Sequence, residues 1–305
     1  MAAQQILKEY TARLSGRVSV GSGSGGGRWL ISAGLLALSL NAHAAEPAVE
    51  NDPATVAPAA EVGDMPLPAD AESLERCLKQ NLPRQSLVQE MRLVAHDASG
   101  SRDLSLKVYG MRLEHEVAVM ISVREPVDMR GSRYLVISGR EVDAMYMYLP
   151  ALGRTRRIVG SMAGQSLWGT DFSYDDVKLV RGLLWQGDST FDPTARWNTR
   201  PAVKVNITPL AANAEEATYD RVELVVDAAT CVIVSGQFFD SAGLVKTLEV
   251  QPEDLEQVDD RWMARKVHVR SPRRNSHSEL IVENLLFDED LRARLFDPRT
   301  FMIGG

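Results

Sequence analysis

The residues that could carry chemistry are few, and their spacing does not suit catalysis. After His43 the chain has four histidines, and none pairs with another histidine or with a cysteine at metal-ligand spacing. In Glu114-His115-Glu116, a strand would turn His115 away from both carboxylates. Ser166 lies in G-x-S-x-x-G, one residue longer than the nucleophile elbow of hydrolases. We therefore expect no catalytic residue, metal site or cofactor, and a serine hydrolase acting through Ser166 is kept only as an alternative.

A group of arginines is the clearest candidate for binding. It consists of Arg154, Arg156 and Arg157. Guanidinium groups pair well with carboxylate or phosphate, so one interpretation is contact with a lipid headgroup or a partner protein at the mouth of a cavity. The other is internal pairing with the acidic residues that follow, Asp171, Asp175 and Asp176. A second group, Arg270, Arg273 and Arg274, is expected to form a solvated face.

Methionine and aromatic side chains form the second candidate set. Its members are Met145, Met147, Leu149, Trp168, Phe172 and Tyr174. On a strand, the first three share one face, while Tyr146 and Tyr148 share the other. Methionine and aromatic side chains suit a cavity that adapts to varied chains. They also suit an ordinary core, and the sequence leaves both interpretations open.

The elements that must position these residues are mostly strands. Leu74, Cys77 and Leu78 have the spacing of one apolar helix face, and Asn81-Leu82-Pro83 ends that helix. Alternating segments then predict strands at 104–109, 117–123, 134–138, 144–149, 203–208, 221–226, 231–239, 244–250, 264–270 and 278–283. Residues 240–243 predict a hairpin turn, and residues 288–296 a last helical turn that starts at Asp288. Residues 161–184 interrupt the strands, so we expect a loop and short helix across the concave face of one antiparallel sheet.

Composition excludes several classes of protein. The chain has 305 residues, 45% hydrophobic and 25% charged, with a net charge of −7. A disordered chain would be poorer in apolar residues. A general nucleic-acid binder would need an excess of basic residues. Two cysteines exclude a disulfide scaffold and a four-thiolate zinc site.

The N-terminal part predicts export. Residues 29–40 form a short apolar run that follows Arg28 and precedes Ala42-His43-Ala44, the pattern of a cleavable signal peptide over 1–44 with an extended basic region. The run is too short to stay as a membrane span. Residues 45–69 are rich in Pro, Ala and acidic residues and predict a disordered linker, so we expect the folded domain over 70–305.

Export would place the two cysteines in a compartment where disulfides form. Outside the cytoplasm a disulfide between Cys77 and Cys231 is allowed, whereas two separate buried thiols are the alternative.

Three motifs carry a resemblance to a known family, and the first two of them are neighbours in the sequence. Residues 148–158 read YLPALGRTRRI, residues 169–176 read GTDFSYDD, and residues 238–246 read FFDSAGLVK. Together they resemble the outer-membrane lipoprotein-sorting-like family, which is related to the periplasmic lipoprotein carrier proteins. The resemblance covers about residues 87–302. It implies a mainly β (α+β) fold, in which a curved antiparallel sheet forms a half-open barrel with short helices over its concave face and an apolar cavity for acyl chains. It supplies no catalytic residues.

From the motifs and the resemblance we expect a periplasmic, non-enzymatic carrier or chaperone. Its ligand would be a lipid or the acyl chains of a lipoprotein, bound on the concave face, and residues 161–176 would act as the lid. The alternative is an accessory subunit that docks on an inner-membrane exporter and carries no cargo. Neither interpretation involves nucleic acid.

Overall fold

The protein is represented by a computed structural model in which residues 67–113, 116–138, 143–159, 162–177, 187–210 and 217–303 are described. The chain divides into two compact units, residues 1–58 and 59–305, and every described residue belongs to the second. The expected signal peptide over 1–44, most of the expected linker over 45–69, His115 and the first residue of the expected lid lie outside the described residues. No helix within the described ranges combines the length and the apolar character that crossing a membrane requires.

The helix predicted near the start of the domain is α2 (Ala71–Lys79). Asp70 caps it, because its carboxylate accepts a hydrogen bond from the Ser73 amide at 2.8 Å and the Ser73 hydroxyl contacts the Asp70 backbone in return. The residues buried on α2 are Leu74, Cys77 and Leu78, as the spacing predicts.

Strands make up most of the domain. Six come before the interruption: β1 (Ser86–Asp97), β2 (Gly100–Arg112), β3 (Val117–Glu125), β4 (Arg133–Ser138), β5 (Ala144–Leu149) and β6 (Arg154–Ile158). Ten follow it: β7 (Gly187–Asp192), β8 (Arg196–Trp197), β9 (Arg200–Pro209), β10 (Arg221–Asp227), β11 (Ile233–Asp240), β12 (Gly243–Glu249), β13 (Leu255–Val258), β14 (Arg261–Ala264), β15 (Lys266–Ser271) and β16 (Ser276–Phe287). Short 3-10 turns are η1 (Pro150–Leu152), η3 (Asp175–Val177), η6 (Pro252–Asp254), η7 (Pro272–Arg274), η8 (Ala293–Phe296) and η9 (Phe301–Ile303).

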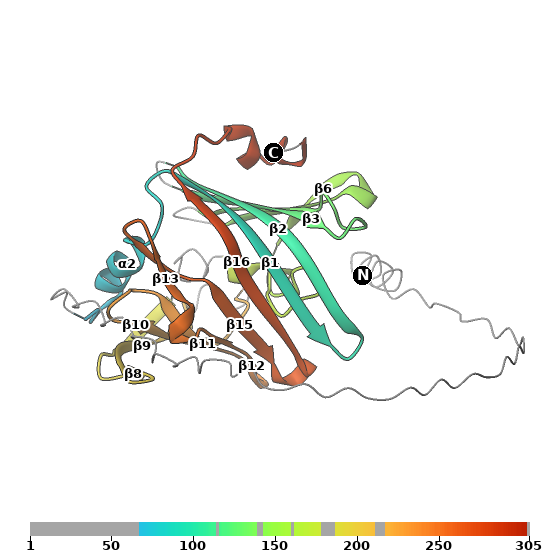
Figure 1. Ribbon diagram of the computed structural model, residues 1–305. Helices are drawn as coiled ribbons and strands as arrows, with labels where there is room; N and C mark the ends of the chain where they lie inside the picture. The colour runs from blue at the N-terminus through green and yellow to red at the C-terminus, as the bar shows by residue number, and fades with distance from the viewer. Residues whose placement is uncertain are drawn as a thin grey trace, which may run out of the picture. The chain divides into compact units, whose positions relative to one another are not determined.

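The main sheet is antiparallel and open. Its order is β6-β5-β4-β3-β2-β1-β16-β15-β12-β11-β10-β9-β7, with β8 paired to β9 and β13 paired to β14 in a separate hairpin. The two end strands, β6 and β7, do not pair with each other, so the sheet curves without closing (Figure 1). The predicted fold class is therefore confirmed.

The first and last strands of the domain, β1 and β16, pair with each other near the middle of the main sheet. Asp288 follows β16 and accepts hydrogen bonds from the amides of Gln85 at 2.7 Å and Ser86 at 3.4 Å. The sequence predicts Asp288 at the start of a helical turn, and this is wrong. Asp288 has a positive φ of 55°, and helical structure begins only at Ala293.

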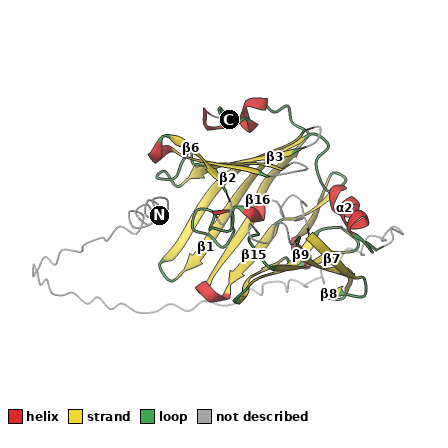
Figure 2. Cartoon of the chain, turned by 180° about the vertical axis from the view of Figure 1, so that it is seen from behind, coloured by secondary structure: helices red, strands yellow, loops and turns green. Residues whose placement is uncertain are grey.

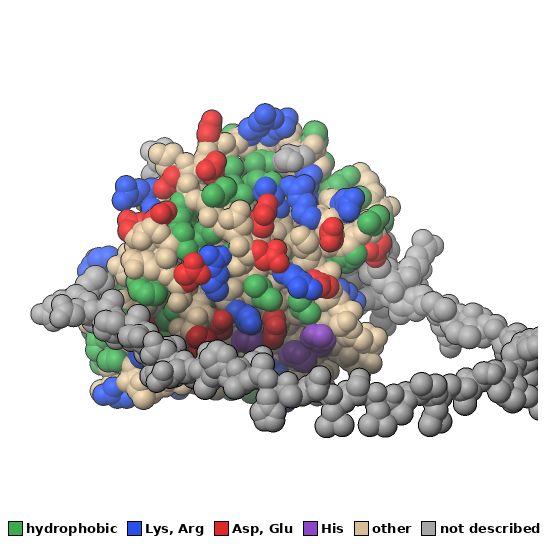
Figure 3. All heavy atoms as spheres, viewed as in Figure 1, with side chains coloured by type: hydrophobic (Ala, Val, Ile, Leu, Met, Phe, Trp, Pro, Cys, Tyr) green, Lys and Arg blue, Asp and Glu red, His purple; other side chains and the backbone are tan. Residues whose placement is uncertain are grey.

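The two faces of the sheet are covered differently. On the concave face, called the inner face here, the largest buried cluster combines strands β1 to β6 with residues 162–177, called the inner segment (Figure 2). Helix α2 covers the same face over β9, β10 and β11. The opposite, outer face of β2 to β4 is covered by the C-terminal turns η8 and η9. Over β1 and β2 the outer face carries interspersed charges, including the pairs Arg92–Asp103 and Lys107–Glu90 (Figure 3).

Candidate functional site

The inner face beneath the inner segment is built from alternate residues of β5 and its neighbours. Met145, Met147 and Leu149 point inward and are buried, whereas Tyr146 and Tyr148 pack on the outer face, as the alternation predicts. All six residues proposed to bind a ligand lie in this single buried cluster. The structure thus brings the candidate set together.

The inner segment packs over the row of inward-facing residues on β5. Trp168, Phe172 and Tyr174 are 5–8% exposed and pack against the inner face. The Tyr134 hydroxyl donates to the carbonyl oxygen of Tyr174 at 2.9 Å, and the Tyr174 hydroxyl contacts the Met147 sulfur at 3.0 Å. The residues predicted as cavity lining and as lid therefore pack against each other.

The inner segment folds as a small hairpin. The amide of Leu167 donates to the carbonyl oxygen of Phe172 at 2.7 Å, and Ser166 bridges to Ser173. The Ser166 hydroxyl donates to the carbonyl oxygen of Thr170 at 2.6 Å, so it supports the turn. The position that suggested a hydrolase therefore has a structural role.

The tip of this hairpin is strained. Trp168 and Gly169 have φ angles of 51° and 79°, in the left-handed region that a bulky residue rarely adopts. A side chain at Gly169 would collide with Arg102, whose guanidinium donates to the carbonyl oxygens of Trp168 and Gly169 at 3.2 and 3.0 Å. The Trp168 indole nitrogen is buried and has no hydrogen-bond partner among the residues that the structure describes. An aromatic residue with a left-handed backbone conformation and a buried donor without an acceptor both cost free energy. The tip is therefore the least favourable part of the inner segment.

A buried carboxylate, Asp171, fixes the hairpin to the η7 turn and the start of β16. It accepts hydrogen bonds from Arg274 at 2.6 Å, Ser276 at 2.5 Å and Ser278 at 2.7 Å. Burial alone would raise the pKa of Asp171, but the hydroxyl donors Ser276, Ser278 and Ser271, together with the charge of Arg274, lower it. The carboxylate is therefore held in its charged form.

A second buried carboxylate, Asp176, pairs with Lys246 of β12. Both side chains are at most 6% exposed. Burial lowers the pKa of Lys246, and the nearby Asp176 opposes that shift. The Tyr219 hydroxyl donates to Asp176 at 3.2 Å, and burial raises the pKa of Tyr219 well above its usual value. Asp171 and Asp176 together anchor the inner segment at two points.

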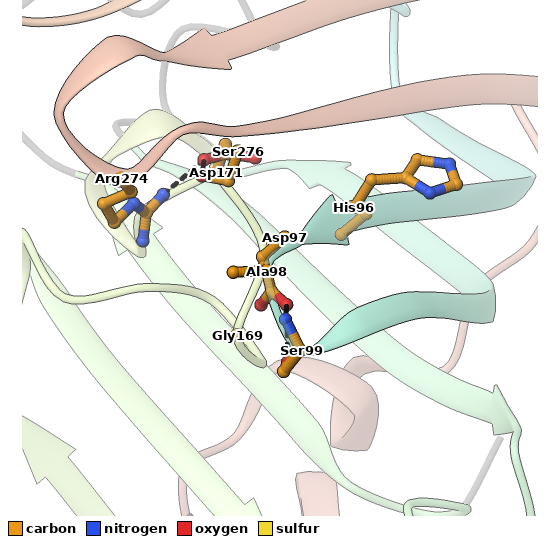
Figure 4. A pocket seen from close by; sticks show the side chains of 9 residues that line it. His96, Asp97, Ala98, Ser99, Gly169, Asp171, Arg274 and Ser276 are labelled. Atoms are coloured by element: carbon orange, nitrogen blue, oxygen red, sulfur yellow. Dashed lines mark hydrogen bonds and ion pairs between the residues drawn. The ribbon is translucent and has the colours of Figure 1, made fainter.

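A pocket of about 300 Å³ lies beside the tip of the inner segment (Figure 4). Its lining comes from the β1–β2 hairpin, the inner segment, the η7 turn and the start of β16: Ala95, His96, Asp97, Ala98, Ser99, Gly169, Asp171, Arg274 and Ser276. In Figure 4 the Arg274 side chain reaches Asp171, while the His96 ring points away from both. His96 instead stacks on His277 with ring centroids 4.8 Å apart.

The arginines of β6 are not paired as one interpretation expected. Asp171 binds Arg274 and Asp176 binds Lys246, so these two carboxylates have other partners. Within the described residues, the side chains of Arg154, Arg156 and Arg157 form no hydrogen bond or ion pair with one another or with any other side chain. The expectation of a solvated face for the later arginine group also needs correction.

That later group is partly engaged. Arg274 binds buried Asp171, and Arg273 forms two hydrogen bonds of 2.7 Å with Asp240. Sequence reasoning missed these links because the partners are about 100 residues apart for Arg274 and only the fold brings them together. Lys246 ends the FFDSAGLVK motif at 238–246, but its sequence neighbourhood does not indicate its buried partner Asp176.

The two cysteines form a disulfide that joins α2 to the turn before β11. Asn81 supports the same junction, because its side-chain amide donates to the carbonyl oxygens of Thr230 at 2.7 Å and Cys231 at 3.2 Å. The link holds the helix over the inner face of β9 to β11.

Within the described residues, no group of three or more histidine, cysteine, aspartate or glutamate side chains is close enough to hold a metal ion. Glu114 and His115 lie outside them.

Comparisons with known proteins agree with this architecture. The chain resembles a DUF1329 family protein from Desulfovibrio piger at 24% identity and a TM-score of 0.67, over 73% of this chain and 94% of that one. It resembles an outer membrane lipoprotein-sorting protein domain from Vibrio parahaemolyticus at 19% identity and a TM-score of 0.67, over 75% and 96% of the two chains. A LolA superfamily protein from Nitrosomonas europaea matches at 14% identity and a TM-score of 0.56, over 74% and 97%. At these identities the likeness concerns the fold.

No curated protein matches the chain. A family model described as an uncharacterized protein matches residues 115–302, more than half of the chain. This match shows that the chain belongs to the family that the model describes. Its fold agrees with the resemblance to the outer-membrane lipoprotein-sorting-like family that the motifs at 148–158 and 169–176 indicated.

Proposed function

We propose that this protein is a periplasmic carrier that binds an acyl chain of a lipid or lipoprotein on its inner face, in exchange for its own inner segment. The single observation that carries the proposal is the inner segment itself. It places the aromatic residues of one family motif on the methionine row of the other, so that the chain supplies its own apolar occupant. The carrier-like fold of the relatives supports the same use of the concave face.

The energetics of exchange are balanced. Five buried apolar side chains of the inner segment would lose their contacts: Leu167, Trp168, Phe172, Tyr174 and Val177. At about 1.5–3 kcal/mol for each, that loss is about 8–15 kcal/mol. An acyl chain of about 16 carbons regains about 12 kcal/mol, at about 0.8 kcal/mol per methylene. One chain therefore roughly offsets the departure of the segment, and cargo binding is reversible, as a carrier requires.

The local structure of the inner segment indicates where exchange begins. Its tip has the strained backbone and the unpaired indole of Trp168, whereas Asp176 is anchored in the core by Lys246. Asp171 lies between them, and its partner Arg274 is about half exposed. We expect the tip to leave first, with Asp176 as the pivot.

The test measures binding of a fluorescent fatty acid to the purified protein and to Trp168→Ala. Removing the indole weakens the competitor, so the affinity for the probe should rise by about tenfold, because a contact worth about 1.4 kcal/mol is lost from the closed state. Trp197→Ala is the matched control: both tryptophans are 8% exposed, but Trp197 lies in a different cluster. Lipid extraction and mass spectrometry of gently purified protein should also reveal bound lipid.

A second candidate, an accessory subunit that docks on an envelope exporter without cargo, is favoured by the filled inner face. It predicts that neither the natural protein nor Trp168→Ala binds the probe or contains extractable lipid. That result would overturn the carrier proposal. A photo-reactive residue at position 156 should then crosslink to an inner-membrane protein in intact cells, whereas one at position 197 should not.

A further inference from the structure

We propose that Arg154 and Arg156 bind the phosphate of an anionic lipid headgroup at the β6 end of the inner face. This inference rests on the proposed carrier function and names the class of lipid that the carrier takes. It starts from a division within the arginine group that the sequence alone did not show.

The pairing of β5 with β6 divides the arginines between the two faces of the sheet. Arg154 lies opposite Leu149 and Arg156 opposite Met147, while Arg157 lies opposite Tyr146. Directly opposed residues of an antiparallel pair share a face. Arg154 and Arg156 therefore lie on the inner face beside the candidate lipid-binding row, in line with buried Ile158, and Arg157 lies on the outer face.

The side chains of Arg154 and Arg156 have N–H donors available for a ligand. Arg156 is half-buried, and its Nε atom is removed from water without a hydrogen-bond partner among the described residues. Arg154 is exposed and forms no ion pair in the same part of the chain. A buried donor that lacks an acceptor is unfavourable, so a ligand oxygen placed here would relieve that cost as well as meet the positive charge.

The geometry fits a phosphate that belongs to a lipid. Two positions apart on a strand, the two arginines are about 7 Å apart along the backbone, close enough for both forks to reach one phosphate group. The methionine row next to them is apolar and adjoins the same edge of the sheet. An anionic phospholipid joins the two chemistries in one molecule, with acyl chains for Met147 and Leu149 and a phosphate for the arginines.

The test compares two labelled lipids that differ only in the headgroup. Phosphatidylcholine vesicles carry a trace of fluorescent phosphatidylglycerol or of fluorescent diacylglycerol with the same chains, and transfer to the full-length protein is measured. The natural protein should extract the phosphatidylglycerol about tenfold better, because charge-assisted hydrogen bonds to phosphate are lost with the diacylglycerol. The double variant Arg154→Gln with Arg156→Gln should reduce this preference to less than about threefold.

Arg157→Gln is the matched control, since it removes the same charge from the same strand on the other face. It should keep the preference within about twofold of the natural protein. An equal loss in both variants would mean that only net charge matters, and it would overturn the proposal. So would a double variant that keeps the full preference.

Two further measurements distinguish a lipid phosphate from free phosphate, and the headgroup inference from the carrier proposal on which it rests. Inorganic phosphate at millimolar concentration should not displace the phosphatidylglycerol; displacement would indicate a simple anion site in place of a headgroup site. Uptake of both lipids without preference would overturn the headgroup inference and leave the carrier proposal standing. Uptake of neither lipid would overturn both. Binding of an acidic peptide by the natural protein but not by the double variant would then identify the arginines as a protein contact.

Discussion

Two covers lie on opposite faces of the same strands, and they are held in different ways. On the outer face, the cover consists of Leu295, Phe296 and Phe301, all apolar and buried. A hydrogen bond from the Arg133 side chain to the carbonyl oxygen of Phe301 links this cover to the sheet, and the cover contributes only a backbone atom to it. On the inner face, the inner segment adds two buried carboxylates to its aromatic contacts.

The difference indicates different roles. An apolar cover gains stability from burial and needs no particular partner. Buried charge pairs contribute little net stability, since desolvation offsets their attraction, but they fix one arrangement because an unpaired charge is costly. The inner segment also contains the strained Trp168. The outer cover is therefore held by apolar packing, whereas charged partners hold the inner segment in one defined arrangement, from which the proposed exchange would release it.

The largest effect should come from breaking the inner charge pair. Lys246→Met leaves Asp176 buried without its cation, which should lower the free energy of unfolding by about 3–5 kcal/mol. Urea denaturation measures this. The double variant Lys246→Met with Asp176→Leu removes both charges and should recover most of the loss. If the single variant unfolds at the same urea concentration as the natural protein, the pair does not anchor the segment.

The next prediction sets the two covers against each other. Phe172→Ala on the inner face and Phe301→Ala on the outer face each delete a buried aromatic ring, so each should lower the free energy of unfolding by about 3 kcal/mol. Only Phe172→Ala should also increase fatty-acid binding, because it alone weakens the occupant of the inner face. Equal binding by both variants, measured with the same fluorescent probe, would remove the distinction between the covers.

The sequence predicted the parts of the molecule that depend on local pattern. The alternation from Met145 to Leu149 predicted which residues of β5 face each side of the sheet, and the turn sequence at 240–243 predicted the hairpin between β11 and β12. Strand β1 was missed, because Gln89 interrupts its inward apolar row while Val88 and Val94 add apolar residues on the outer side. The strands β7, β13 and β14 are short and lack a clean apolar alternation, so they were missed as well.

The candidate site also divides into features that the local sequence predicts and features that depend on long-range pairing. The two motifs already contained both the methionine row and the aromatic residues that cover it, and alternation placed the row on one face. Which cation serves which carboxylate was not predictable. Three arginines lie near Asp171 in the sequence, yet it pairs with Arg274, which lies in the η7 turn just before β16. Long-range pairing of this kind needs the fold.

The smallest effect tests the inner anchor through pH. The pKa of Asp171 is lowered in the folded protein, and an unfolded aspartate has a pKa of about 3.9. As pH falls, the unfolded chain therefore takes up the proton first. The stabilisation from Asp171 is complete above about pH 4 and is lost as the pH falls through the lower folded value. Asp171→Asn cannot titrate, so its stability should fall less steeply between pH 5 and 3 than that of the natural protein. Parallel curves of unfolding free energy against pH would show that the serine and arginine donors around Asp171 contribute no charge-specific stabilisation, and the charged anchoring of the inner segment would then rest on Asp176 and Lys246.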